Sequence, residues 1–153
     1  MFKENLFYKG LEAIKKEPSE IVEESPSQKF IGFINQIEGW KTKCKNLHWA
    51  APKKNIHVYL DDFLGVLSDY QDSLAEGYMG ILGQMAPNAV KATPCECLNA
   101  IDFINEVRVK TVEFYDSLPT ETVYKGITSE CETFIQNINK FSYLFSLCDV
   151  RPY

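Results

Sequence analysis

The sequence predicts an all-α fold in which four helices form one bundle. Apolar side chains recur at intervals of three and four residues in four separate stretches, the spacing that places them on one face of a helix. The longest of these stretches, from Val58 to about Met79, contains no proline. The chain has 153 residues, of which 45% are hydrophobic and 24% are charged, values ordinary for one soluble domain with a sizeable core.

Composition and charge narrow the class of protein further. The formal net charge of -5 at pH 7 argues against a generally basic surface that coats DNA. The cysteine count of 5 is odd and no signal peptide precedes the domain, so reduced thiols in a cytoplasm are the simplest expectation. No apolar run is long enough to cross a bilayer, so we expect a cytoplasmic protein with no membrane partner.

Residues 1–26 are expected to form an N-terminal arm, partly helical or flexible, ahead of a bundle that occupies residues 27–153. The second half of the arm is charged and contains prolines. A lysine-rich tail can bind DNA by neutralising its phosphates, but the lysines of this arm are mixed with glutamates. This composition disfavours a DNA-binding tail and leaves a docking arm as an open alternative. The residues concerned are Lys3, Lys9, Lys15, Lys16, Glu4, Glu12, Glu17, Glu20, Glu23 and Glu24.

The first helix of the bundle is expected to start with Ser27 as its N-cap and to end at Pro52. His48 falls on its apolar stripe, where a single histidine is commonly a core residue. The nearness in sequence of His57 and several carboxylates favours a metal-ligand role instead. The apolar positions are Phe30, Phe33, Ile34, Ile37, Trp40, Cys44 and Leu47.

Five lysines lie near the end of this helix and in the turn that follows it. Most such basic clusters are solvated, so DNA is kept as a partner only as a hypothesis. The cluster consists of Lys41, Lys43, Lys45, Lys53 and Lys54.

Four candidate metal ligands lie on one stripe of the long second helix. His57 falls in its first turn, and Asp61, Asp72 and Glu76 follow within an arc of roughly 100°, because each residue turns the helix by about 100°. The apolar stripe lies roughly 120° away, so one face fills the core of the subunit while a neighbouring face can meet a partner. That apolar stripe consists of Leu60, Phe63, Leu64, Leu67, Leu74 and Ile81.

One helix cannot bring these four ligands to one ion. Asp61 and Asp72 are about 16 Å apart along the axis, whereas a metal–oxygen bond is about 2 Å. A second copy of the helix, antiparallel across a twofold axis, would set His57 opposite Glu76 of the partner subunit and Asp61 opposite Asp72 of the partner subunit. A solvated acidic face on a core helix is the alternative interpretation. The small residues at the crossing point would be Gly65 and Ser68.

The segment after the long helix is expected to be a connection. It begins where Gly80 and Gly83 weaken the helix, and its thirteen or so residues, up to Ala92, could extend about 40 Å, enough to run back along a bundle. Cys95 and Cys97 then form a single Cys-x-Cys with no second pair, so free thiols are expected there rather than a thiolate metal site.

The third and fourth helices complete the predicted bundle. A capping box at Thr93–Glu96, with Pro94 at the first helical position, predicts the start of the third helix, which stops near Pro119. Neither helix contains Glu-x-x-His, which argues against a di-iron centre inside one bundle. Their apolar positions are Leu98, Ile101, Phe103, Ile104, Val107, Val112, Phe114 and Tyr115, then Ile127, Cys131, Phe134, Ile135, Ile138, Phe141, Leu144, Phe145 and Cys148.

The histidines and carboxylates occur in an order that resembles the ferroxidase signature of the Dps family, the mini-ferritins also called DNA-binding proteins from starved cells. The order is His-Trp, then His-x3-Asp, then ten residues, then Asp-x2-Ala-Glu, and it is formed here by His48–Trp49, His57–Asp61 and Asp72–Glu76. The resemblance covers about residues 27–148, and its specific part is His48–Glu76.

The resemblance implies a ferritin-like four-helix bundle with a long B–C connection, between its second and third helices, that assembles through antiparallel twofold contacts of the second helix. It implies that iron is bound between subunits, with zinc or manganese as substitutes for the same carboxylate and imidazole ligands. Trp49 matches a tryptophan beside the iron that would supply an electron, and packing is its alternative role. The implied ligands are His48, His57 and Asp61 of one chain with Asp72 and Glu76 of its twofold mate.

The implied activity is that of a ferroxidase, which oxidises iron(II) with hydrogen peroxide or dioxygen. Ferric iron would be stored in a hollow shell of twelve subunits, a dodecamer, and cells would be protected against oxidative damage. Two alternatives stay open: a non-catalytic Dps-like structural protein with a structural metal or none, and a bundle that its N-terminal arm docks onto a larger assembly.

Overall fold

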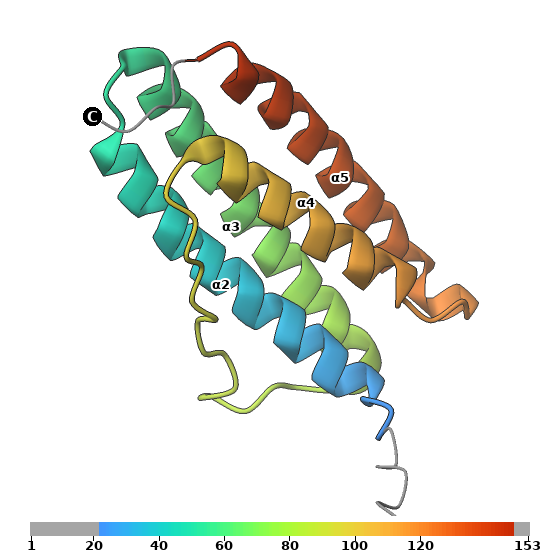
Figure 1. The fold of residues 1–153 in the computed structure, drawn as a ribbon. Coiled ribbons are helices and arrows are strands. Elements are labelled where there is room, and N and C mark those ends of the chain that lie inside the picture. The colour runs from blue at the N-terminus through green and yellow to red at the C-terminus, as the bar shows by residue number, and fades with distance from the viewer. Residues whose placement is uncertain (1–21, 149–153) are drawn as a thin grey trace, which may run out of the picture.

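A computed structural model describes residues 22–148, which form four α-helices and one short 3₁₀ helix (Figure 1). The predicted all-α fold with four helices is therefore confirmed, and residues 22–148 contain no strand. Most of the predicted N-terminal arm, residues 1–21, and the last residues, 149–153, lie outside the described part of the chain. The elements are α2 (Pro26–Ala50), α3 (Lys54–Leu82), α4 (Ala100–Asp116), η2 (Thr122–Tyr124) and α5 (Lys125–Ser146).

Helix α2 begins two residues earlier than the sequence predicted, because the N-cap is Ser25 and not Ser27. The Ser25 hydroxyl accepts a hydrogen bond from the backbone N–H of Gln28, and the side chain of Gln28 accepts one from the backbone N–H of Ser25. This capping box satisfies two N–H groups that no helical carbonyl can reach. The Ser27 hydroxyl instead lies 2.8 Å from the Tyr78 hydroxyl on α3.

The four helices form two antiparallel hairpins, α2 with α3 and α4 with α5 (Figure 1). Only residues 51–53 separate α2 from α3, and such a short link leaves the two helices as neighbours. The connection between the hairpins, residues 83–99, runs back beside α2, so that α4 runs in the same direction as α3 (Figure 1). Gly83 ends α3 with a φ of 92°, a left-handed conformation that glycine adopts without a steric penalty.

The connection is held against α2 by backbone contacts. The N–H of Thr93 donates to the backbone oxygen of Asn35 at 2.9 Å, and the N–H of Lys91 donates to the Asn35 side chain at 2.8 Å. Gly39 makes this close approach possible, because a Cβ there would overlap the backbone carbonyl of Thr93.

The predicted start of the third helix, at Thr93–Glu96, is therefore wrong. The chain is still non-helical there, and α4 has Asn99 as its N-cap, with the side chain of Asn99 accepting from the N–H of Asp102 at 2.8 Å. The capping signal does not start a helix here, because this segment instead forms a backbone hydrogen bond with α2 and buries Cys95 against the bundle. A consequence is that Leu98, predicted on the apolar face of that helix, is 81% exposed.

The core lies between the predicted apolar faces of the four helices and is rich in aromatic rings. Phe33 of α2 stacks on Phe114 of α4 with ring centroids 4.0 Å apart, and Phe63 of α3 contacts Phe141 of α5 at 4.9 Å. Trp40 is fully buried against Phe33. Within residues 22–148, no helix has both the length and the apolar character of a membrane-spanning segment.

Candidate metal site

The two histidines of the chain lie together at the turn between α2 and α3. Their rings are stacked, with centroids 3.7 Å apart and an angle of 26° between the ring planes. His48 Nδ1 lies 2.8 Å from the backbone oxygen of His57, and His57 Nδ1 lies 2.8 Å from the backbone oxygen of His48. The pair of reciprocal bonds closes the turn, and we call it the histidine pair.

These hydrogen bonds determine which ring nitrogens are available to bind another group. A carbonyl oxygen only accepts hydrogen bonds, so in a neutral ring each Nδ1 carries the proton and each Nε2 is left as a lone-pair donor. Within residues 22–148, no hydrogen bond to either Nε2 is present. An imidazole held by an Nδ1–H bond to a backbone carbonyl, with Nε2 free, is the arrangement of a metal-binding histidine.

The three predicted carboxylates lie on α3 and are exposed. Asp61 is one helical turn after His57, and Asp72 and Glu76 follow farther along the same helix. Between them Gly65 is also exposed, and a Cβ at this glycine would meet no atom within 4 Å. This stripe of α3 is therefore not covered by the described part of its own chain.

A single chain brings together two of the predicted ligands, His48 and His57. Among residues 22–148, no three of the five predicted ligands place their ligating atoms within 4.8 Å of one another. The geometry of one chain thus agrees with the argument from helix rise that Asp61 and Asp72 cannot reach the same ion from one helix.

Trp49, the predicted electron donor, follows the histidine pair but faces outward. Its side chain is 68% exposed, and Lys45 Nζ lies 5.7 Å from the centroid of its ring, within the range of a cation–π contact. Packing in the core, the alternative role for this tryptophan, does not apply within the single chain.

A polar network lies beside Asp72 in a groove of about 510 Å³ between α2 and α3. Lys41 Nζ forms an ion pair with Glu38 at 3.2 Å and donates to Gln71 at 2.9 Å, and Gln71 in turn donates to Glu38 at 2.9 Å. The hydrogen bond from Gln71, and then Lys41, hold the pKa of Glu38 below its usual value against the opposing effect of burial. Lys41, one of the five clustered lysines, is thus engaged within the bundle.

A second group of potential metal ligands was not predicted by the sequence. Cys95 and Cys97 on the connection and Glu106 on α4 offer ligating atoms that all lie within 4.8 Å of one another. Cys97 Sγ donates to one oxygen of Glu106 at 3.2 Å, and Trp40 Nε1 donates to the other at 3.1 Å. The Cys-x-Cys motif was the available signal, but the third member becomes a neighbour only when α4 packs on the connection.

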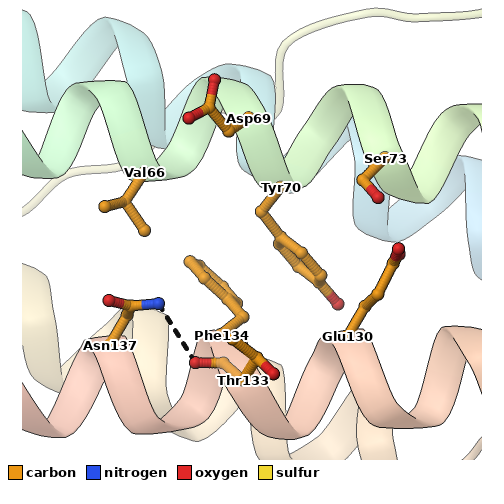
Figure 2. Close-up of a pocket in the computed structure, with 8 residues that line it drawn as sticks. All are labelled: Val66, Asp69, Tyr70, Ser73, Glu130, Thr133, Phe134 and Asn137. Carbon is orange, nitrogen blue, oxygen red and sulfur yellow. Dashed lines mark hydrogen bonds between the residues drawn. The ribbon is translucent and has the colours of Figure 1, made fainter.

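A shallow groove of about 330 Å³ lies between α3 and α5 (Figure 2). Tyr70 and Phe134 point toward each other across it, with their rings stacked at a centroid distance of 4.1 Å (Figure 2). The Tyr70 hydroxyl is buried and has no hydrogen-bond partner within residues 22–148. Burial, and then the neighbouring Cys131 thiol, raise the pKa of Tyr70, so this hydroxyl stays protonated at neutral pH.

Comparisons with models of known protein families, with curated proteins and with solved structures give no match to this chain.

Proposed function

We propose that this protein is a Dps-like ferroxidase that oxidises iron(II) at a site between two subunits and stores ferric iron in a hollow shell. In this proposal two copies of α3 pack antiparallel across a twofold axis. His48, His57 and Asp61 of one chain bind iron together with Asp72 and Glu76 of the partner subunit. Zinc and manganese suit the same nitrogen and oxygen ligands and would compete with iron.

The histidine pair is the observation that carries the proposal. Each Nδ1 is committed to a backbone carbonyl at 2.8 Å, so both rings are fixed in orientation, and neither Nε2 is bonded to a residue within 22–148. Two stacked rings held in this way, each with an Nε2 that no described residue bonds, form a preorganised pair of nitrogen donors. The next turn of α3 adds the exposed carboxylate of Asp61.

The exposed stripe of α3 supports the antiparallel arrangement. Asp61, Gly65, Asp72 and Glu76 are all exposed in the single chain, and the open space above Gly65 leaves room for a second helix to approach closely. An isologous contact uses the same patch on both subunits, so one patch supplies two symmetric sites. The path of the connection, which joins two antiparallel hairpins over the length of the bundle, agrees with the long crossover of ferritin-like folds.

The proposed reaction is an electron transfer from iron to a peroxide. Two iron(II) ions lose one electron each, and the two electrons break the O–O bond of one hydrogen peroxide and reduce it to two water molecules once protons are added. The ferric product then takes hydroxide from water and releases protons as it mineralises. The surrounding carboxylates favour the higher charge of iron(III) electrostatically, which makes the oxidation more favourable.

The test is an anaerobic titration of the purified full chain with iron(II), followed by stopped-flow addition of hydrogen peroxide. We expect rapid growth of the ferric absorbance and, by light scattering, a particle of about twelve subunits. The double variant Asp61→Ala, Asp72→Ala should bind and oxidise iron at least about tenfold more slowly. Asp62→Ala is the matched control, because Asp62 is an exposed carboxylate of α3 outside the ligand stripe, and it should behave like the wild type.

Three results would count against the proposal. Wild-type oxidation rates in the double variant would exclude these ligands. Tight iron binding without peroxide-dependent oxidation would indicate a structural metal site. A monomer that binds no iron would favour the docking role for the same bundle.

A further inference from the structure

We propose that Cys95, Cys97 and Glu106 form a second metal site, separate from α3, that takes a thiophilic divalent cation, with Zn²⁺ as its chemical match. The ligating atoms of all three side chains lie within 4.8 Å of one another. Two sulfurs and one carboxylate oxygen form a borderline-soft set, which suits zinc better than the harder iron(II), manganese or magnesium ions.

The extended chain of the connection is what places the two thiols together. In an extended segment the side chains of residues i and i+2 point to the same side, whereas in a helix they are separated by about 200°. Residues 91–98 are non-helical, so Cys95 and Cys97 face the same neighbour. The helix predicted from the local capping signal would have separated them.

Glu106 is held in place by a group that is not itself a metal ligand. Trp40 Nε1, from the buried core of α2, donates to Glu106 Oε1 at 3.1 Å. The other oxygen, Oε2, accepts the thiol proton of Cys97 at 3.2 Å. The thiol proton thus lies between the sulfur and the oxygen that a cation would bridge, and the Trp40 N–H already orients the carboxylate.

The carboxylate of the cluster has no ion-pair partner in the described part of the chain. Within residues 22–148, no lysine, arginine or histidine forms an ion pair with Glu106, although this carboxylate is half-buried. A bound divalent cation would displace the thiol protons and balance the charge of the carboxylate.

A metal ion here would link three parts of the chain. The thiols lie on the connection, the carboxylate on α4, and the orienting tryptophan on α2. Three protein ligands occupy three positions of a tetrahedron and leave the fourth for water. The ion would fix the connection to the bundle at a second point, beyond the Thr93 hydrogen bond to Asn35.

The probe is Co²⁺, which binds in place of Zn²⁺ at protein zinc sites. Thiolate ligands give bound cobalt a charge-transfer absorption band that histidine and carboxylate ligands do not produce. The reduced full chain is titrated with Co²⁺ and then with Zn²⁺. We expect one thiolate-bound cobalt per chain, displaced by one equivalent of zinc. Cys95→Ser and Cys97→Ser should each lose or strongly weaken the band. Glu106→Gln keeps an acceptor for Trp40 and should lower the cobalt affinity by about tenfold or more.

Two controls separate this site from other metal binding. Cys148→Ser removes a half-buried thiol two residues after the end of α5 and should leave the band unchanged. The double variant Asp61→Ala, Asp72→Ala should also keep it, because the proposed inter-subunit site contributes no sulfur. Absence of the band in the wild type, or its persistence when Cys95 and Cys97 are both serine, would overturn the proposal.

A measurement on the wild type avoids any folding defect of the variants. Zinc should slow the alkylation of Cys95 and Cys97 by N-ethylmaleimide, mapped by mass spectrometry, by about tenfold or more, while Cys148 reacts at the same rate with and without zinc. Equal rates at Cys95 and Cys97 in both conditions would contradict the site.

Discussion

The imidazole rings of His48 and His57 are stacked with centroids 3.7 Å apart, and each ring donates its Nδ1–H to the backbone oxygen of the other residue. The two nitrogens of each ring therefore have different surroundings, and in the proposed function they have different roles. Nδ1 closes the turn between α2 and α3, and Nε2 remains as a lone-pair donor. The two roles can be tested separately.

Replacement of His57 by asparagine or alanine should separate turn closure from metal binding. An asparagine amide can donate to the His48 carbonyl as Nδ1 does but supplies no Nε2, so His57→Asn should keep the free energy of unfolding and weaken iron binding. His57→Ala should lose both the hydrogen bond to the His48 carbonyl and the Nε2 ligand, and its free energy of unfolding should fall by up to about 1 kcal/mol. Urea denaturation and iron titration measure the two effects, and equal iron affinity in His57→Asn and wild type would remove His57 from the ligand set.

Substitution of two glycines of α2 should have opposite effects. A Cβ at Gly39 would overlap the carbonyl of Thr93, so Gly39→Ala should displace the connection and lower the free energy of unfolding by about 2 kcal/mol or more. Gly32 is exposed, with no atom within 4 Å of an added Cβ, so Gly32→Ala should raise stability by about 0.5–1 kcal/mol. Chemical denaturation compares them, and similar stabilities would show that the connection does not depend on this close approach.

Two buried tyrosines should respond differently to the loss of the hydroxyl. The Tyr70 hydroxyl is buried without a partner, so Tyr70→Phe should leave stability unchanged or raise it by about 1 kcal/mol. The Tyr78 hydroxyl bonds to Ser27 at 2.8 Å, and Tyr78→Phe should cost about 1 kcal/mol. Thermal unfolding of both variants measures the contrast. A larger loss for Tyr70→Phe than for Tyr78→Phe would mean that Tyr70 has a partner in solution.

Stability should fall at alkaline pH because of buried thiols. Burial, with a smaller effect of Asp61, raises the pKa of Cys44 from 9.0 to about 12. Below pH 9 the thiol is protonated in both states. Between the two values the unfolded chain loses the proton and the folded chain keeps it, so the free energy of unfolding decreases by about 1.4 kcal/mol per pH unit for this group.

The measurement is urea denaturation of the reduced protein at pH 8, 9 and 10, compared with Cys44→Ala. The variant should show a shallower decrease above pH 9, whatever its stability at pH 8, because the other buried thiols and Tyr70 remain. Identical slopes for the two proteins would contradict a buried protonated thiol at this position.

The sequence was informative where periodicity decides structure. The predicted apolar stripes of α2, α3 and α5 include the buried residues Phe33, Phe63 and Phe141, because a helix that packs on one side needs apolar side chains every three or four residues. The site residues on α3 could be placed on one stripe for the same reason. Their assembly across two subunits remains a prediction.

A local sequence signal gives the wrong structure where a contact between distant segments overrides it. The capping box at Thr93–Glu96 is a strong helix start in isolation, yet Thr93 bonds to Asn35, more than fifty residues earlier in the chain. Such a contact leaves no periodic pattern. The same error concealed the grouping of Cys95 and Cys97 with Glu106, since the thiols share a side only in an extended chain.

The connection also divides the chain into two halves that could be separated. Each hairpin is continuous, and the turn at 86–89, where the N–H of Ala89 donates to the carbonyl of Ala86, is exposed except at Ala89, which is half-buried. Lys91 and Thr93 lie after this turn, whereas Asn35 and Gly39, which they contact, lie on α2, so a cut there would leave these contacts between the two fragments. We therefore expect that the two hairpins, expressed as separate fragments divided at this turn, would reassemble through the aromatic core that they share.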